Sequence, residues 1–313
     1  MGVIFANVFY PPLAEFTAEA PDGAVIGLIG DDAAGQRELL RLAAGLVRPV
    51  AGELQRAGAA RLLRPDDELD FSPVDVLLLD HALATRDPVV KHQARAAIER
   101  LRRRGTTVLI ASHDEALLEA AADEIWWLHQ GRLMARGAAR DVLATWRRHV
   151  LRRLLEWGES ARMVLEPAFR RGDGRAELVE LETLDECKRP TMVWESGRPV
   201  AVRVTVRFRQ AVEDPVVGIM IRTRIGFEVY GTNTELERVR LGPCRPGEIL
   251  RVLFSFPCNL CPQQYTLTAA SHDPDGVWHD WMEDAVAFEV VDSRYTAGVA
   301  NLRAVVSFER FGG

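Results

Sequence analysis

A glycine-rich loop near the start of the chain has the residue types and spacing that hold phosphate groups. The apolar run 24–29 leads into Gly30-Asp-Asp-Ala-Ala-Gly35-Gln36-Arg37, and a helical pattern follows over residues 36–45. A strand, a glycine loop and a helix N-terminus in this order direct backbone N–H groups at phosphate oxygens. The backbone pattern therefore predicts a phosphate cradle formed around Gly30 and Gly35.

The side chains of this loop do not match that backbone. Gln36 stands where a lysine would place a charge on the β- and γ-phosphates, and Arg37 stands where Ser or Thr would ligate Mg²⁺. Glutamine carries no charge and arginine offers no lone pair to a metal ion. Asp31 and Asp32 bring further negative charge to the loop. Taken alone, the motif is a weak predictor of nucleotide binding.

The elements around the loop alternate between strands and helices. Residues 24–29, 74–79, 107–111 and 125–128 have strand patterns, and residues 36–45, 91–104 and 115–122 have helical ones. This alternation predicts a parallel sheet with helices on its faces. A connecting helix over 139–157 carries an apolar stripe on one face. The stripe consists of Leu143, Trp146, Val150, Leu154 and Trp157.

Arg147, Arg148, Arg152 and Arg153 fall outside the stripe of the connecting helix. One interpretation is a helix packed on a neighbouring domain with a solvated basic face. The alternative is a helix that docks to a partner, forms a dimer or contacts anionic lipid.

Several segments in the correct order resemble the nucleotide-binding domain of ABC transporters. Residues 38–52 resemble the segment after Walker A, and Val76-Leu-Leu-Leu-Asp80 resembles Walker B. Residues 111–114 resemble the switch segment, and residues 123–132 resemble the closing strand of that fold. The resemblance implies roles for Asp80 beside Mg²⁺, Asp87 in the D-loop and His113 at the γ-phosphate. It also suggests that Tyr10 stacks on adenine.

The departures from this family concern catalysis. His81 replaces the glutamate that follows Walker B, and residues 53–73 are too few to hold the Q-loop, the helical subdomain and the signature segment. The resemblance implies ATP and Mg²⁺ as ligands, but these departures argue against both. We expect a shortened α/β P-loop domain over residues 1–138 that lacks the helical subdomain and serves as a scaffold. The alternatives are nucleotide binding without turnover, and hydrolysis with His81 as a substitute base.

The second half of the chain has short alternating strands separated by turn residues. The clearest strands cover residues 200–208, 216–223, 227–231, 249–256, 265–271 and 285–291. Without helical patterns between them, they predict an all-β antiparallel sandwich of the Ig-like or jelly-roll-like kind. We place a connecting helix and linker over 139–174, the sandwich over 175–293, and a tail over 294–313. Residues 304–308 could add a strand, either at an edge of this sheet or across to a second protomer.

Segments of this second half resemble the C-terminal domain of the ATPase subunit of O-antigen polysaccharide exporters, the Wzt type. They include Glu195-Ser-Gly197, residues 217–234, Pro246-Gly-Glu248 and residues 264–268. The resemblance implies that the sandwich binds the exported glycan. Sugar sites combine aromatic faces with amide, carboxylate and guanidinium groups. The candidates are Arg222, Arg224, Tyr230, Asn233, Trp278, Asp280 and Trp281, each of which could instead be solvated or belong to the core. Trp194 is assigned to the core.

The composition argues against a nucleic-acid-binding protein and against a membrane-spanning one. The 313 residues are 48% apolar and carry a net charge of −6, which argues against a nucleic-acid binder. Apolar runs are too short to span a bilayer, and no targeting segment is visible, so we expect a cytoplasmic protein that reaches the membrane through a permease. Cys258 and Cys261 form a lone CxxC pair, and no spacing shows that Cys187, Cys244 or His272 completes a zinc site with it. We expect reduced thiols and no metal, and the alternative is metal or redox use of the pair.

Three functional hypotheses remain from the sequence. The first is a non-catalytic or weakly catalytic subunit of a polysaccharide exporter. Its partners are a glycan, a membrane permease, an intact ATPase subunit and, in a homodimer, a second copy. The second is an active ATPase of the same exporter class. The third is a protein-interaction scaffold without a ligand.

Overall fold

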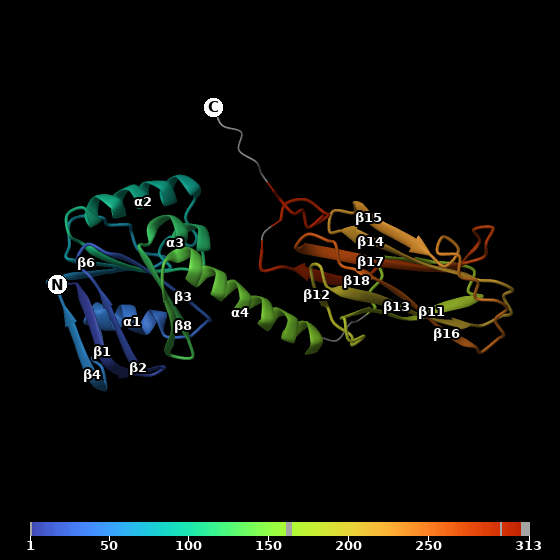
Figure 1. The fold of residues 1–313 in the computed structure, drawn as a ribbon, viewed down its shortest axis with the longest axis horizontal. Helices are drawn as coiled ribbons and strands as arrows, with labels where there is room; N and C mark the ends of the chain where they lie inside the picture. The colour runs from blue at the N-terminus through green and yellow to red at the C-terminus, as the bar shows by residue number, and fades with distance from the viewer. Residues whose placement is uncertain (1, 161–164, 295, 308–313) are drawn as a thin grey trace, which may run out of the picture. The chain divides into compact units, whose positions relative to one another are not determined.

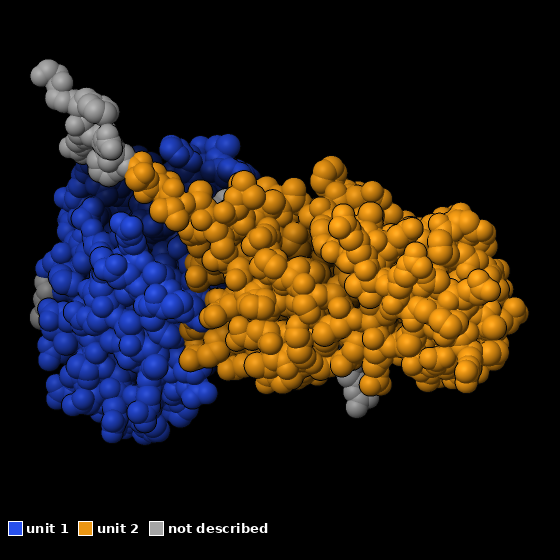
Figure 2. All heavy atoms as spheres, turned by 45° about the vertical axis from the view of Figure 1, so that its right-hand side comes forward, with its two compact units in different colours: residues 1–148 blue, residues 149–313 orange. Residues whose placement is uncertain are grey.

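The chain forms two compact units. The computed structural model describes residues 2–160, 165–294 and 296–307. Figure 2 shows the two units, residues 1–148 and residues 149–313. Among the described residues, no helix has both the length and the apolar character needed to cross a membrane.

A six-stranded sheet forms the centre of the first unit (Figure 1). Its order is β5-β6-β7-β3-β8-β9, and all neighbours are parallel except β8 and β9. The strands are β3 (Val25–Gly30), β5 (Ala60–Leu63), β6 (Val76–Asp80), β7 (Thr107–Ala111), β8 (Glu124–His129) and β9 (Arg132–Gly137). Every residue of β3, β6 and β7 is buried, as continuous apolar runs in a sheet covered on both faces require. The predicted parallel sheet is confirmed.

Helices cover both faces of this parallel sheet. In Figure 1, α1 (Gln36–Ala43) lies on one face, and α2 (Pro88–Arg102) and α3 (Glu115–Ala121) lie on the other. Asp87 caps α2 by accepting hydrogen bonds from the backbone N–H groups of Val89 and Val90 at 2.8 and 3.0 Å. A capping carboxylate satisfies amides that have no partner within the helix.

A second sheet of three antiparallel strands packs against α1, and the sequence did not predict it. It contains β1 (Val3–Tyr10), β2 (Leu13–Ala20) and β4 (Ala51–Arg56) in the order β2-β1-β4. Its apolar face joins one core with α1 and the parallel sheet. The rings of Phe5, Phe16 and Trp126 meet there, with centroids 5.4 to 6.3 Å apart.

Helix α4 (Ala139–Ser160) continues the chain from the first unit into the second. Its first turns bury Val142, Leu143 and Trp146, and the ring of Trp146 lies 6.1 Å from that of Trp127. The predicted stripe is wrong at its far end, because Trp157 is 55% exposed. The four arginines of the opposite face are exposed, in line with a solvated basic face.

The second unit is a sandwich of two sheets. One has the order β10-β18-β17-β14-β15, with β12 also paired to β18, and the other has the order β11-β13-β16. The strands of the first are β10 (Phe169–Arg171), β12 (Val193–Glu195), β14 (Val216–Thr223), β15 (Glu228–Asn233), β17 (Gln263–His272) and β18 (Trp278–Val291). Those of the second are β11 (Ala176–Leu184), β13 (Pro199–Phe208) and β16 (Ile249–Pro257). All pairs are antiparallel except β12 with β18, so the predicted sandwich is confirmed.

One continuous core fills the space between the two sheets. It includes Trp194, which is 1% exposed and lies 4.4 Å from the ring of Phe288. Trp194 is therefore a core residue, as predicted from the sequence.

The tail leaves the sandwich without adding a strand in the part of it that the structure describes. Residues 301–307 have no strand assignment, and Phe308 lies outside the described residues. The side chains of Leu302, Val305 and Val306 are 87%, 97% and 87% exposed. The edge strand considered for this segment is therefore not formed by residues 304–307.

The buried carboxylate of Asp280 links the two sheets. It accepts a hydrogen bond from the backbone N–H of Leu178 on β11 at 2.7 Å, and it pairs with Arg170 on β10 at 2.7 and 3.0 Å. Hydrogen bonding to Asp280 raises the pKa of Arg170. Asp280 is 5% exposed, so its loss would leave a buried amide and a partly buried guanidinium without their acceptor.

We expect Asp280→Ala to lower the free energy of unfolding of the second unit by about 2–3 kcal/mol, because breaking a partly buried pair costs more than losing a surface one. Urea denaturation of the full chain, followed by tryptophan fluorescence, measures the change. Asp275→Ala in an exposed turn is the matched control, with a change within about 0.5 kcal/mol. Equal effects of the two variants would contradict the structural role of Asp280.

Candidate functional site

The phosphate-type loop lies at the carboxyl ends of the parallel strands, where ligands of such sheets bind. Gly30 ends β3 and Asp80 ends β6, while Gly35 precedes α1 with a φ of 110°. A Cβ on Gly30 would lie 2.3 Å from the carbonyl oxygen of Leu128, and one on Gly35 would lie 2.4 Å from the side chain of Leu13. Both glycines are therefore required by the packing of the loop itself.

Gln36 does not reach outwards as a phosphate-binding side chain would. It is 7% exposed, and its amide Nε2 donates a hydrogen bond to the carbonyl oxygen of Asp31 at 3.4 Å. The amide group also lies 2.5 Å from the position of a Cβ on Gly30. The side chain therefore packs against the loop that it follows.

Arg37 places a guanidinium beside the Walker B carboxylate. Its Nε lies 3.3 Å from Oδ2 of Asp80, and the two side chains are 70% and 8% exposed. The other oxygen of Asp80 is buried and has no hydrogen-bond partner among the described residues. The cation that neutralises Asp80 is thus supplied by the chain itself. These residues do not fit Mg²⁺, because Arg37 adds a competing charge and no ligand atom.

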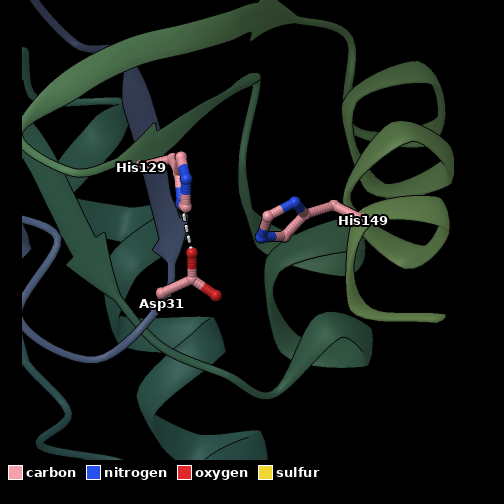
Figure 3. Close-up of side chains that lie close together, drawn as sticks. All are labelled: Asp31, His129 and His149. Atoms are coloured by element: carbon pink, nitrogen blue, oxygen red, sulfur yellow. Dashed lines mark hydrogen bonds and ion pairs between the residues drawn. The ribbon is translucent and has the colours of Figure 1, made fainter. Parts of the chain in front are cut away.

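Carboxylates dominate the cavity around this loop. The cavity has a volume of about 320 Å³ and is lined by Asp31, Asp32, Ala33, Gln36, Arg37, Glu38, Asp80, His81 and His113. This lining carries four carboxylates and one guanidinium. Asp31 is paired with His129 at the end of β8, as Figure 3 shows. A triphosphate would meet this acidic surface without the lysine that normally offsets its charge.

The two histidines of the predicted site do lie together. The rings of His81 and His113 are 5.1 Å apart, and Nε2 of His113 lies 3.1 Å from the carbonyl oxygen of Gly30. Burial, followed by the charge of His113, lowers the pKa of His81, although Asp80 acts in the opposite direction. The lowered pKa favours the neutral imidazole of His81, the form that a general base requires.

Two further residues of the predicted nucleotide site, Tyr10 and Asp87, lie outside the cavity, and the described segment between α1 and β6 has no helix. Tyr10 is partly buried against the core of the first unit and does not line the cavity. Asp87 is used as the cap of α2 and does not line the cavity either. No helix lies between Ala43 and Pro88, a stretch that is described throughout. The predicted absence of a helical subdomain is therefore confirmed.

We expect the double variant Gln36→Lys, Arg37→Ser to bind ATP·Mg²⁺ at least about tenfold more tightly than the natural chain, because it adds the missing charge and removes the guanidinium from Asp80. Isothermal titration measures the affinity. Adding Asp80→Ala should cancel the gain. In a parallel turnover assay we expect background hydrolysis by the natural chain, and hydrolysis abolished by Asp80→Ala would contradict this interpretation.

A second cavity, of about 360 Å³, lies on the outer face of the larger sheet of the sandwich. Its floor consists of small or flexible residues from neighbouring strands. Ala270 lies directly across from Gly218, and Met220 lies between Thr268 and Gly231. Residues paired in this way point to the same face of a sheet. The cavity forms because Gly218 and Gly231 place no side chains on this part of the sheet.

An aromatic wall borders this floor. The ring of Trp278 lies 4.6 Å from that of Trp281 and 4.8 Å from that of His272. Asn233, Tyr230 and Glu228 on β15 line the cavity as well. Tyr230 packs its ring 5.6 Å from that of Phe256 in the other sheet. Three of the seven glycan candidates, namely Asn233, Trp278 and Trp281, thus line one cavity. Tyr230 also borders it, but this residue pairs with Ile221 of the core and its ring packs against the other sheet.

The other three glycan candidates lie elsewhere. Arg222 is paired with Glu283 at 2.5 Å and with Glu228 at 3.1 Å, beside the cavity. Burial by itself lowers the pKa of Arg222, but these carboxylates outweigh burial and raise it. Arg224 lines a different cleft, with Ile225 and Phe227. Asp280 is used in the link between the sheets.

Sequence reasoning missed most of the cavity floor, including Met220, Gly231 and Thr268, and also Glu228 and His272 on its walls. No local signal marks these residues, because only the pairing of β14 with β15 and β17 brings them together.

Three of the four cysteines are buried. Cys244, Cys258 and Cys261 are 3%, 0% and 1% exposed, whereas Cys187 is exposed. Burial raises the pKa of Cys258 to about 11. Within the described part of the chain, no cysteine belongs to a cluster of three or more potential metal ligands.

We expect the thiol reagent DTNB at pH 8 to modify Cys187 rapidly and Cys258 only after unfolding, because the thiolate is the reactive form. Release of the coloured thiolate measures both rates. The Cys187→Ser variant should remove the fast phase, and a fast phase that persists in it would contradict the assignment.

Comparison with known proteins gives a different result for each half. Residues 168–302 match the family model of the Wzt C-terminal domain. The chain is 37% identical over 131 residues to the hemin import ATP-binding protein HmuV of Rhodopseudomonas palustris strain BisB18, covering 41% of this chain and 45% of that protein. It is 33% identical over 105 residues to the methionine import ATP-binding protein MetN of strain BisB5, covering 33% and 26%. The chain therefore spans less than half the length of these curated relatives.

Among solved structures, the crystal structure of the C-terminal domain of Wzt is 22% identical, with a TM-score of 0.44, and covers 47% of this chain and 93% of that one.

Proposed function

We propose that this chain, a Wzt-type ABC ATP-binding subunit, binds polysaccharide through its sandwich and hydrolyses little or no ATP. In this role it is an accessory subunit of an O-antigen-type exporter that brings the glycan to the transporter. The single observation that carries the proposal is the contrast between the two cavities. One is acidic and holds its own cation, and the other has an aromatic wall beside a low floor.

The side chains of the nucleotide cavity support the absence of turnover. Phosphoryl transfer depends on positioned charge, and here Gln36 packs against its own loop while Arg37 occupies the carboxylate of Asp80. No segment between β5 and β6 is long enough to supply a signature helix to a partner. Burial favours the neutral form of His81 by lowering its pKa, but a base alone supplies only part of what the reaction needs.

The shape of the sandwich cavity supports a sugar ligand. Sugars present C–H faces that pack against aromatic rings, and hydroxyls that hydrogen-bond with amide and carboxylate groups. The wall of Trp278 and Trp281 provides the first kind of contact. Asn233 and Glu228 on the opposite side provide the second. A cavity of about 360 Å³ is large enough for one or two sugar rings.

The implied partners follow from the ABC relationship of the first half. Proteins of this kind act with a membrane permease, and a chain without its own signature segment needs an intact ATPase subunit for turnover. We therefore propose a cytoplasmic protein held at the membrane by these partners. In a dimer, the exposed tail residues Leu302, Val305 and Val306 would be available to a second copy.

We expect Trp278→Ala and Trp281→Ala each to weaken glycan binding at least about tenfold, because stacked aromatic contact is a main source of affinity in such sites. A bacterial glycan array identifies the ligand for the full chain, and titration with the best array ligand measures the loss. Arg224→Ala, in the other cleft, is the control and should bind normally. If the chain binds no glycan on the array, the scaffold hypothesis is favoured.

A further inference from the structure

The sandwich cavity carries almost no charge on its lining, and the charge it has is negative. Of the described residues that line it, Glu228 is the one carboxylate, and none is lysine or arginine. The other polar groups include the amide of Asn233, the hydroxyl of Thr268 and the imidazole of His272, whose Nδ1 lies 2.7 Å from the carbonyl oxygen of Asp273. A ligand in this cavity therefore finds hydrogen-bonding groups and aromatic rings, but no cation aimed at it.

One cation beside the cavity, Arg222, is already neutralised. Its side chain is only 13% exposed and contacts Glu283 at 2.5 Å, Glu228 at 3.1 Å and Asp284 at 4.0 Å. Three carboxylates around one guanidinium leave an excess of negative charge at this end of the cavity. An anionic ligand would have to displace one of them to reach Arg222, which leaves that carboxylate without its partner.

Arg171 is the other cation close to the cavity, and it lies over the ring of Trp281. Its guanidinium carbon is 5.5 Å from the ring centroid. Arg171 lies directly across from Trp281 in the sheet, so both side chains point to the outer face, but Arg171 does not line the cavity. Glu228 on β15 lines the cavity, whereas neither Arg171 nor Arg222 does.

We infer that this cavity selects uncharged sugars and discriminates against sugars that carry a carboxylate or phosphate group. The inference rests on the proposed function, and it adds the chemical class of the glycan. Glu228 accepts hydrogen bonds from hydroxyl groups, and the same carboxylate repels an anionic substituent. The Glu228 side chain is 60% exposed, so this repulsion is partly screened by solvent and is strongest at low ionic strength.

The test compares each neutral sugar with its own acidic form. Mannohexaose, maltohexaose, galactohexaose and the best neutral ligand of the glycan array are oxidised at C6 to the corresponding uronates. The full chain is titrated with both members of each pair at low ionic strength. We expect each acidic form to bind at least about tenfold more weakly than its neutral parent, and the difference to shrink at high salt.

The Glu228→Gln variant tests the source of this selectivity. It keeps the size and the hydrogen-bonding capacity of the side chain, but removes the charge. We expect the ratio of neutral to acidic affinity to fall at least about threefold. Glu213→Gln makes the same change at an exposed residue outside the cavity and should leave the ratio unchanged. Thermal denaturation of both variants shows whether they fold.

The outcomes separate this inference from the proposed function. If acidic forms bind as tightly as neutral ones, or more tightly, the selectivity is wrong while glycan binding stands. If Glu228→Gln and Glu213→Gln change the ratio equally, Glu228 is not its source, and the inference fails at that step. If neither member of any pair binds, the proposed function fails, and this inference fails with it.

Discussion

The alternation of side chains along paired strands is the constraint on which the second unit depends. Each strand of the larger sheet must direct one set of residues into the core shared with the other sheet, as Ile219, Ile221 and Leu267 do. The other set then faces outwards, where the core between the two sheets does not constrain the size of its side chains. That freedom allows Gly218, Met220 and Ala270 to form a floor and Trp281 to stand beside it. The same pairing that stabilises the sandwich thus builds its cavity.

In the first unit, too, the residues that form the core are largely separate from those that line the cavity of the phosphate-type loop. Its core consists of apolar residues from β1, β2, α1 and the parallel sheet. Gln36 and Arg37, the two unusual residues of the phosphate-type loop, do not belong to that core. Gln36 and Arg37 could therefore replace the usual side chains while the fold remained. The strand, loop and helix arrangement of this unit is thus stabilised by residues other than Gln36 and Arg37.

The fold was predictable from the sequence where a pattern was local. The buried runs that became β3, β6 and β7 stand out as continuous apolar segments, and the turn residues of the second half mark its strands. The sheet of β1, β2 and β4 was missed because its strands mix exposed and buried residues, with register shifts in the pairing. Trp157 was assigned to a buried stripe because helical spacing shows which residues share a face of the helix. It does not show how far along the helix that face is covered by other residues.

The candidate sites were predictable to a smaller extent, for a physical reason. Glu228, Met220 and His272 lie on three strands, and only hydrogen-bonded register brings them together. The pair formed by Asp31 and His129 likewise joins the ends of two neighbouring strands that are far apart in sequence. Asp280 shows the opposite case, since its neighbours Trp278 and Trp281 suggested a ligand contact, but its side chain points to the other sheet.

The contact between Arg37 and Asp80 has a consequence for the physiology of the molecule. A cation that is part of the chain cannot be diluted, chelated or exchanged, so its presence does not follow the energy state of the cell. Ordinary ABC ATP-binding domains change partners as nucleotide and metal come and go. In this chain the charge opposite Asp80 belongs to Arg37, a side chain of the protein itself, so it is present whether or not metal or nucleotide is available.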